Sequence, residues 1–193
     1  MSANHRKELV KALEDDVYDV TDNGIYFPKQ GILAVGEYFH RVNDQEWEIS
    51  LNKLTTEGLT HLLNVGLGSK AKAAGYYLAL FSGSTAPADN WTAANFASVA
   101  SEIVSLTEGY TNATRPQWVP ADATTNSIDN MGTVAQLTIA TSSQLNVTGS
   151  ALLTNPTRGG TTGVLVSATK YTAARTFQDG DIFSVGYRIS LSN

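Results

Sequence analysis

The sequence predicts a mainly β-structured protein, with a jelly-roll or β-sandwich domain and an N-terminal helical or extended arm. Charged residues make up 16% of the chain, and Thr, Ser, Ala, Asn and Gly take their place, as they do in tight turns and on half-buried strands. Short segments of alternating apolar residues are separated by turn sequences, which is typical of two-layered β domains. The hydrophobic fraction of 42% is sufficient for a core.

The first segment, Asn4–Val20, has the periodicity of an amphipathic helix. Val10, Leu13, Val17 and Val20 follow one another at helical spacing and form one narrow apolar stripe. A short helix with such a stripe is marginal alone and requires a surface to pack on. That surface is either the chain's own domain or a neighbouring subunit, so Val10, Leu13 and Val17 are candidate interface residues.

We expect the arm to cover residues 1–54 and the β domain to cover residues 55–193. Within the arm, Asp22-Asn23-Gly24 is a strong turn signal. The expected strands that follow it are Ile25–Phe27, Gly31–His40 and Glu46–Leu51. In the last of these, apolar and acidic residues alternate, which predicts a strand with one solvated face.

A short helix opens the expected β domain. Thr55 or Thr56 caps its first turn, and the Gly66-Leu67-Gly68 stretch ends it. Its expected apolar stripe consists of Leu59, Leu62, Leu63 and Leu67.

The remaining chain is predicted to be largely β. Tyr76–Phe81 is almost wholly apolar, as in a strand that is buried on both faces. A polar loop, Ser82–Asn95, contains Trp91 and leads to a short helical turn through Phe96, Val99 and Ile103. The later expected strands are Thr133–Ala140, Gly163–Tyr171 and an alternating last strand from Phe183 to Leu191.

The sequence carries no recognisable catalytic or metal-binding motif, so we predict a protein that is not an enzyme and uses no cofactor. There are no cysteines, and His5, His40 and His61 do not show the spacing of a metal site. The Gly66-Leu67-Gly68-Ser69-Lys70 stretch lacks the spacing of a phosphate-binding loop. Asp179-Gly180-Asp181 lacks the further ligands of a calcium loop and is interpreted as a hairpin turn.

The charge distribution argues against nucleic acid as a partner. Residues 1–68 hold eleven acidic and six basic side chains, whereas residues 69–193 hold seven of each. Neither part forms the basic stripe that phosphate binding requires. The chain has no apolar run long enough to span a membrane, and residues 1–20 lack the apolar core of a secretory signal, so we expect neither a membrane partner nor a signal.

Residues 55–193 resemble structural proteins of tailed-bacteriophage virions. The resemblance is carried by residues 76–81 (YYLALF), 87–94 (PADNWTAA), 108–110 (EGY), 115–118 (RPQW) and 174–181 (ARTFQDGD), the last followed by an alternating strand. Residues 56–65 (TEGLTHLLNV) are similar to the short helix that precedes the domain in such proteins.

The resemblance implies a jelly-roll capsid decoration, or cement, protein on the outside of a phage capsid, assembled in the host cytoplasm. The implied partners are the major capsid protein and further copies of the chain, as a dimer or trimer. Trp91 and Trp118 are candidate interface anchors, because desolvated tryptophans often dominate interfaces. A tail or baseplate protein is the first alternative. A carbohydrate-binding module that uses Trp91 or Trp118 is the second, and a hydrolase comes last.

Overall fold

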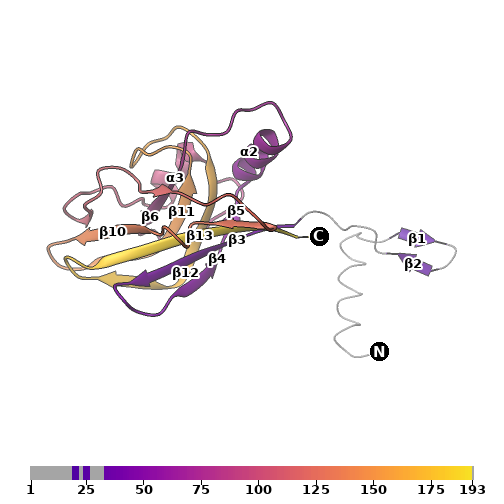
Figure 1. The fold of residues 1–193 in the computed structure, drawn as a ribbon. Coiled ribbons are helices and arrows are strands. Elements are labelled where there is room, and N and C mark those ends of the chain that lie inside the picture. The colour runs from indigo at the N-terminus through magenta and orange to yellow at the C-terminus, as the bar shows by residue number, and fades with distance from the viewer. Residues whose placement is uncertain (1–18, 22–23, 27–32, 193) are drawn as a thin grey trace. The chain divides into compact units, whose positions relative to one another are not determined.

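A computed structural model of the chain describes residues 19–21, 24–26 and 33–192 (Figure 1). The chain divides into two compact units. Unit 1 comprises residues 1–33 and 192–193, and unit 2 comprises residues 34–191. This division differs from the one expected after residue 54, because strands from residues 34–54 are hydrogen-bonded into both sheets of unit 2.

Unit 1 contains a pair of antiparallel strands, β1 (Asp19–Thr21) and β2 (Gly24–Tyr26). Thr21 pairs with Gly24, so the strands flank the turn expected at Asp22-Asn23-Gly24. The prediction that the helix extends to Val20 is wrong at its end, where Asp19 and Val20 belong to β1. The rest of the expected helix, with Val10, Leu13 and Val17, lies outside the described residues.

Unit 2 is mainly β and contains two antiparallel sheets, which confirms the predicted β class. The six-stranded sheet has the order β4-β3-β13-β10-β7, with β9 paired to β13. Its strands are β3 (Leu33–Val42), β4 (Glu48–Leu51), β7 (Gly109–Tyr110), β9 (Ser127–Asp129), β10 (Ala135–Ala140) and β13 (Ile182–Ser192).

The five-stranded sheet has the order β5-β12-β11-β6-β8. Its strands are β5 (Lys53–Leu54), β6 (Tyr76–Phe81), β8 (Gln117–Trp118), β11 (Leu145–Leu153) and β12 (Leu165–Phe177). The expected strand at Tyr76–Phe81 is therefore confirmed. β12 continues beyond the predicted end at Tyr171, and β11 was not predicted.

A single apolar cluster joins the inward sides of the two sheets. Tyr38, Leu137 and Val185 contribute to it from the six-stranded sheet, while Leu80 and Val166 contribute from the five-stranded sheet. These side chains are almost wholly removed from water, and such burial is the main favourable term in folding.

A second apolar cluster covers the outer side of the five-stranded sheet. The short helix α3 (Ala93–Val99) supplies Phe96, which packs against Phe81 of β6 and against Trp91 in the preceding loop. β6 is consequently buried on both faces, as its apolar sequence predicted.

Helix α2 (Thr56–Gly66) lies over the five-stranded sheet with an unexpected face inward. Thr55 caps it, since its side-chain oxygen accepts a hydrogen bond from the Gly58 N–H at 3.0 Å. Gly58 and His61 are its buried residues, and a Cβ on Gly58 would lie only 2.0 Å from the Val166 carbonyl oxygen of β12. The helix therefore packs closely through a residue without a side chain.

The apolar residues expected along one stripe of this helix are mostly exposed. Leu59, Leu63 and Leu67 are 43%, 62% and 87% exposed, and only Leu62 turns partly inward. β4 departs from its prediction in a similar way, because its apolar residues Ile49 and Leu51 face solvent.

Candidate interface surfaces

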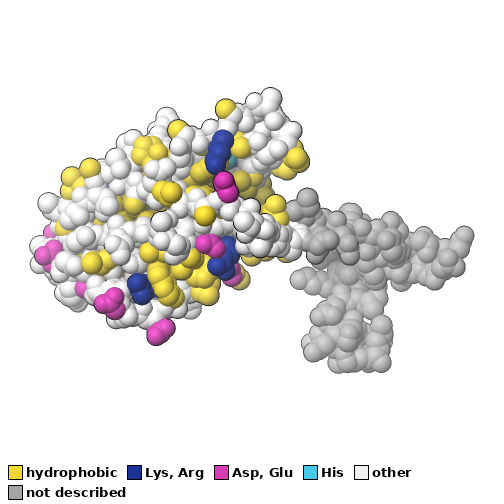
Figure 2. All heavy atoms as spheres, in the orientation of Figure 1, with side chains coloured by type: hydrophobic (Ala, Val, Ile, Leu, Met, Phe, Trp, Pro, Cys, Tyr) yellow, Lys and Arg dark blue, Asp and Glu magenta, His cyan; other side chains and the backbone are white. Residues whose placement is uncertain are grey.

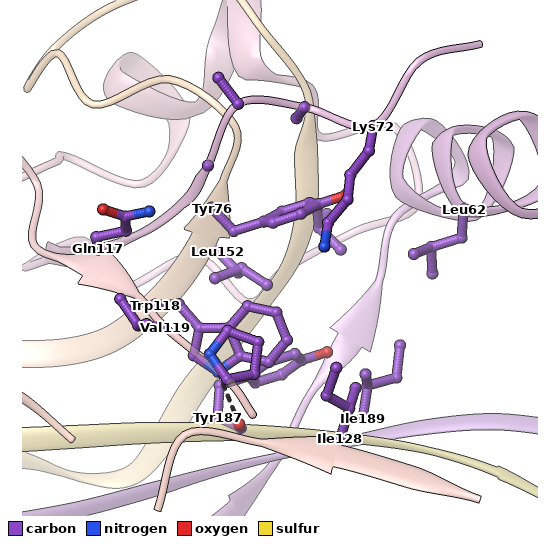
Figure 3. A pocket seen from close by; sticks show the side chains of 15 residues that line it. Leu62, Lys72, Tyr76, Gln117, Trp118, Val119, Ile128, Leu152, Tyr187 and Ile189 are labelled. Atoms are coloured by element: carbon purple, nitrogen blue, oxygen red, sulfur yellow. Dashed lines mark hydrogen bonds between the residues drawn. The ribbon is translucent and has the colours of Figure 1, made fainter. Parts of the chain in front are cut away.

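An apolar groove lies at one end of the two sheets, below α2 (Figure 3). It consists of two adjoining hollows of about 280 Å³ and about 330 Å³, which share Leu62, Ile128 and Ile189. We call this surface the end groove. Its remaining apolar lining includes Tyr76, Trp118, Val119, Leu152, Val166, Tyr187 and Leu191.

Three aromatic residues give the first hollow a fixed shape. The Trp118 indole N–H donates a hydrogen bond to the Tyr187 carbonyl oxygen at 2.9 Å, shown as a dashed line in Figure 3. The Trp118 ring meets the Tyr76 ring edge-on at a centroid distance of 5.9 Å, and it meets Tyr187 at 5.8 Å. Burial raises the pKa of Tyr187 to about 12. The wall is therefore preorganised and apolar.

Polar side chains such as Gln117, Asn126 and Ser127 also line the end groove, and a hydrogen-bonded pair forms part of its rim. His61 of α2 and the Tyr76 hydroxyl are hydrogen-bonded through Nε2 at 3.1 Å. Burial first, and then the positive charge of Lys70, lowers the pKa of His61. Lys72 extends beside the Tyr76 hydroxyl in Figure 3 and is the one charged residue among the described residues that line the groove. This rim suits a ligand that carries an anionic group next to an apolar one.

The exposed leucines of α2 form a second surface, which we call the leucine stripe and define as Leu59, Leu63 and Leu67. Figure 2 shows hydrophobic side chains on and below α2, at the upper right of the view. Scattered exposed leucines are normal on proteins, but three at helical spacing on one helix form a continuous apolar ridge. A ridge of this kind is typical of a surface that contacts another protein.

Trp91 is not exposed, which corrects the expectation of an aromatic loop facing a partner. Its ring is 3% exposed and packs edge-on against Phe81 at 6.1 Å and Phe96 at 6.4 Å. The polar sequence around Trp91 concealed this burial, because α3 and its loop fold back over β6. Trp91 fills the core of its own unit and offers no stacking surface for a sugar.

A buried cluster of charges, which we call the loop clasp, holds segments 102–116 and 154–160, which are irregular apart from the two-residue strand β7. Arg115 donates two hydrogen bonds of 2.7 Å to the Glu102 carboxylate, and both side chains are fully buried. The Arg158 guanidinium donates to the carbonyl oxygens of Ser105, Tyr110 and Asn112 at 2.6, 2.9 and 2.7 Å. These charge-assisted contacts fix the loops without regular secondary structure.

The predicted turn at Asp179-Gly180-Asp181 is confirmed. Gly180 adopts a φ of +81°, and the Asp181 carboxylate accepts hydrogen bonds from the Gln178 N–H and the Asn43 side chain. The Asp179 carboxylate accepts from the Thr141 N–H. The two carboxylates thus stabilise the turn and join it to the loops that contain Asn43 and Thr141.

The described histidines lie apart from one another. His40 is buried beside Tyr171 of β12, His61 lies on α2, and His5 is outside the described residues. No three His, Asp or Glu side chains of residues 19–21, 24–26 and 33–192 gather as metal ligands do. Within the same ranges, every helix is too short or too polar to cross a bilayer.

No protein-family model matches the sequence, and no curated protein is significantly similar to it. Of the two predicted interface tryptophans, Trp118 is also buried, at 6% exposed, but it lines the first hollow, whereas Trp91 does not. Sequence reasoning missed Tyr76, Ile128 and Ile189 as groove residues, because they come from separate strands and share no local spacing.

Proposed function

We propose that the protein is a structural virion protein, which binds the outside of a phage capsid and stabilises it by bridging capsomers. The observation that carries the proposal is the leucine stripe, an apolar ridge on a helix whose opposite face is already packed on the domain. The resemblance of residues 55–193 to virion structural proteins supports the same conclusion. A protein that covers this ridge would remove the three leucine side chains from water.

We further propose that unit 2 is a β-sandwich of the jelly-roll type. β10 pairs with β13 in one sheet, while β11 pairs with β12 in the other. The connection from β10 to β11 and the connection from β12 to β13 therefore both cross from one sheet to the other. Neighbouring strands of a jelly roll cross in the same way. Such folds expose their loops and edges at two ends, which suits contacts with several neighbours.

A cement role has an additive physical basis. One copy needs to bind only modestly, because many symmetric copies bridge neighbouring capsomers and their contributions sum over the shell. Capsids without the protein are accordingly expected to assemble, and to fail earlier than complete capsids under heat or low salt.

The test compares capsids that carry the wild-type protein, no protein, or a Leu63→Glu variant. Leu63 is 62% exposed, so a charge there leaves the fold intact but opposes apolar contact. We expect occupancy of the capsid to fall at least about tenfold, corresponding to about 1.4 kcal/mol. Val104→Glu, at a 50% exposed valine outside α2, is the matched control and should bind normally.

Protein-free capsids that are as robust as complete ones would rule out the cement role. Electron microscopy of the particle would then test the first alternative, in which the protein lies on the tail or baseplate. If the Leu63→Glu and control variants occupied the capsid equally, the leucine stripe would not contribute to capsid binding.

A further inference from the structure

The Tyr76 hydroxyl, at the rim of the end groove, has a hydrogen that is free to donate. His61 Nε2 shares a hydrogen bond with this hydroxyl, while His61 Nδ1 is buried and has no hydrogen-bond partner among the described residues. A buried N–H without an acceptor is rarer than a buried acceptor without a donor. This favours the tautomer in which Nε2–H donates to the Tyr76 oxygen, so the Tyr76 O–H is left to donate to a ligand.

Lys72 places a positive charge beside this hydroxyl. Figure 3 shows its side chain extending past the Tyr76 ring toward the open space of the first hollow. Within the described chain, none of the ion pairs includes Lys72. The Glu57 carboxylate of α2 does not line the groove, and its Oε2 atom accepts from the Ala93 and Leu165 N–H groups at 2.8 and 2.7 Å. An adjacent ammonium group and hydroxyl can together donate to one carboxylate.

The rest of the end groove suits an unbranched apolar chain. Ile128 lines both hollows, and Leu191 lines the second. Two polar side chains of the second hollow are already paired, since Asn126 donates to the Leu191 carbonyl oxygen at 2.7 Å and the Ser127 hydroxyl is hydrogen-bonded to Thr125 at 3.3 Å. A bound peptide would gain few hydrogen bonds from this lining, whereas an alkyl chain requires none. A slim chain also follows two adjoining hollows more closely than a flat ring does.

We infer that the end groove binds a medium-chain fatty acid, with its carboxylate at Tyr76 and Lys72 and its alkyl chain along the two hollows toward Leu191. Hollows of about 280 Å³ and about 330 Å³ are of the size that small-molecule sites have. Fatty-acid binding at this site is independent of the proposed capsid function, because it uses neither the leucine stripe nor a partner protein.

Calorimetric titration of the purified full-length protein at neutral pH compares decanoate with decan-1-ol. The alcohol has a chain of the same length but no charge, so it enters a purely apolar site more readily than the ionised acid does. We expect decanoate to bind at least about threefold more tightly than decan-1-ol. From heptanoate to decanoate, the affinity should rise about threefold to fourfold with each methylene. Equal or tighter binding of decan-1-ol, or no binding of decanoate, would overturn the inference.

Two lysine variants test the position of the carboxylate. Lys72→Met replaces the ammonium group with an apolar side chain and should abolish the preference for decanoate over decan-1-ol. Lys70→Met is the matched control, because Lys70 lies two positions earlier and does not line the groove. This control should keep the preference. Equal losses in the two variants would mean that general charge attraction holds the acid, and would overturn the contact with Lys72.

Tyr76→Phe removes only the hydroxyl from the rim. The dissociation constant of decanoate should rise at least about threefold in this variant, because a charge-assisted hydrogen bond is lost. Unchanged binding of decanoate would overturn the placement of the carboxylate at Tyr76.

The tryptophan indole N–H signals of nitrogen-15-labelled protein locate the alkyl chain. Trp118 lines the first hollow, whereas Trp91 is buried in the second apolar cluster and does not line either hollow. Decanoate should therefore shift the Trp118 signal and leave the Trp91 signal in place. Binding without a shift of the Trp118 signal, or with an equal shift of the Trp91 signal, would place the ligand elsewhere and overturn the inference.

Discussion

His40 is a histidine that the fold holds within its core. Its ring lies 4.1 Å from the Tyr171 ring and is 1% exposed, and its Nε2 atom is hydrogen-bonded to the Ser50 hydroxyl at 3.1 Å. Burial first, and then the positive charge of Arg175, lowers the pKa of His40 to about 4. The neutral imidazole is therefore the form that the folded protein accommodates.

This shift makes the stability of the protein sensitive to mild acid. Between pH 6.5 and 4 the unfolded chain binds a proton at His40 that the folded chain does not, so the free energy of unfolding falls as the pH is lowered through that window. The loss reaches about 3 kcal/mol at the lower end. Urea denaturation at a series of pH values measures it.

A His40→Gln variant serves as the control, because glutamine can still hydrogen-bond to Ser50 but does not titrate. The variant should show a flatter profile over the same window, because only the His40 contribution is removed. Parallel profiles for the two proteins would mean that another group causes the acid sensitivity.

At the scale of elements, the contact between α2 and β12 depends on one glycine. The backbone of Gly58 lies so close to Val166 that an added methyl group must move the helix. We expect Gly58→Ala to lower the free energy of unfolding by about 1–3 kcal/mol, despite the higher helix propensity of alanine. Chemical denaturation provides the measurement.

Gly66, at the other end of the same helix, is the matched control. A Cβ there would have no neighbour within 4 Å, so Gly66→Ala should be neutral or stabilise by up to about 1 kcal/mol. A destabilisation of similar size at both positions would show that close packing on β12 is not the cause.

Among the longer strands, those that were predicted and the one that was missed, β11, differ in how visible their pattern is in the sequence. β13 presents apolar and small or polar residues on opposite faces over its whole length, and its alternation was visible. β11 was missed because its pairing with β12 shifts between Val147 and Gly149, and again after Leu152. The second shift places its extra residue in β12, and residues 149–153 of β11 are all buried, so no simple apolar–polar period is visible in its sequence.

The buried face of α2 could not be predicted from the sequence, for a different reason. A stripe of leucines normally marks the buried face of a helix. Here the buried face is selected by the close approach that Gly58 permits and by the hydrogen bond between His61 and Tyr76. Neither contact is local in the sequence. The same is true of the end groove, whose walls come from strands on both sheets.

At the scale of the whole molecule, we expect unit 2 to carry the stability of the fold. Both apolar clusters consist of residues within unit 2. Deletion of residues 1–22 should therefore leave a cooperatively unfolding protein, with a melting temperature within about 4 °C of the full chain. Circular dichroism measures the melt, and loss of a cooperative transition would show that the arm is part of the core.

The same deletion should weaken binding to capsids at least about tenfold if the arm contacts a neighbour in the particle. Capsids lacking the protein provide the binding assay, and full-length protein provides the reference. Unchanged binding would remove residues 1–22 from the proposed function, but not the leucine stripe.

The loop clasp also has a consequence for resistance to proteolysis. Arg158 precedes Gly159 in an irregular segment, where an enzyme that cleaves after arginine would ordinarily find its substrate. Its guanidinium is held by several main-chain carbonyl oxygens, and the Gly159 N–H donates to the buried Glu102 carboxylate. Cleavage by such an enzyme therefore requires local unfolding of the segment, and this unfolding limits the rate of cleavage. A chain without cysteines thus protects a long loop from digestion through buried charged side chains and their hydrogen bonds.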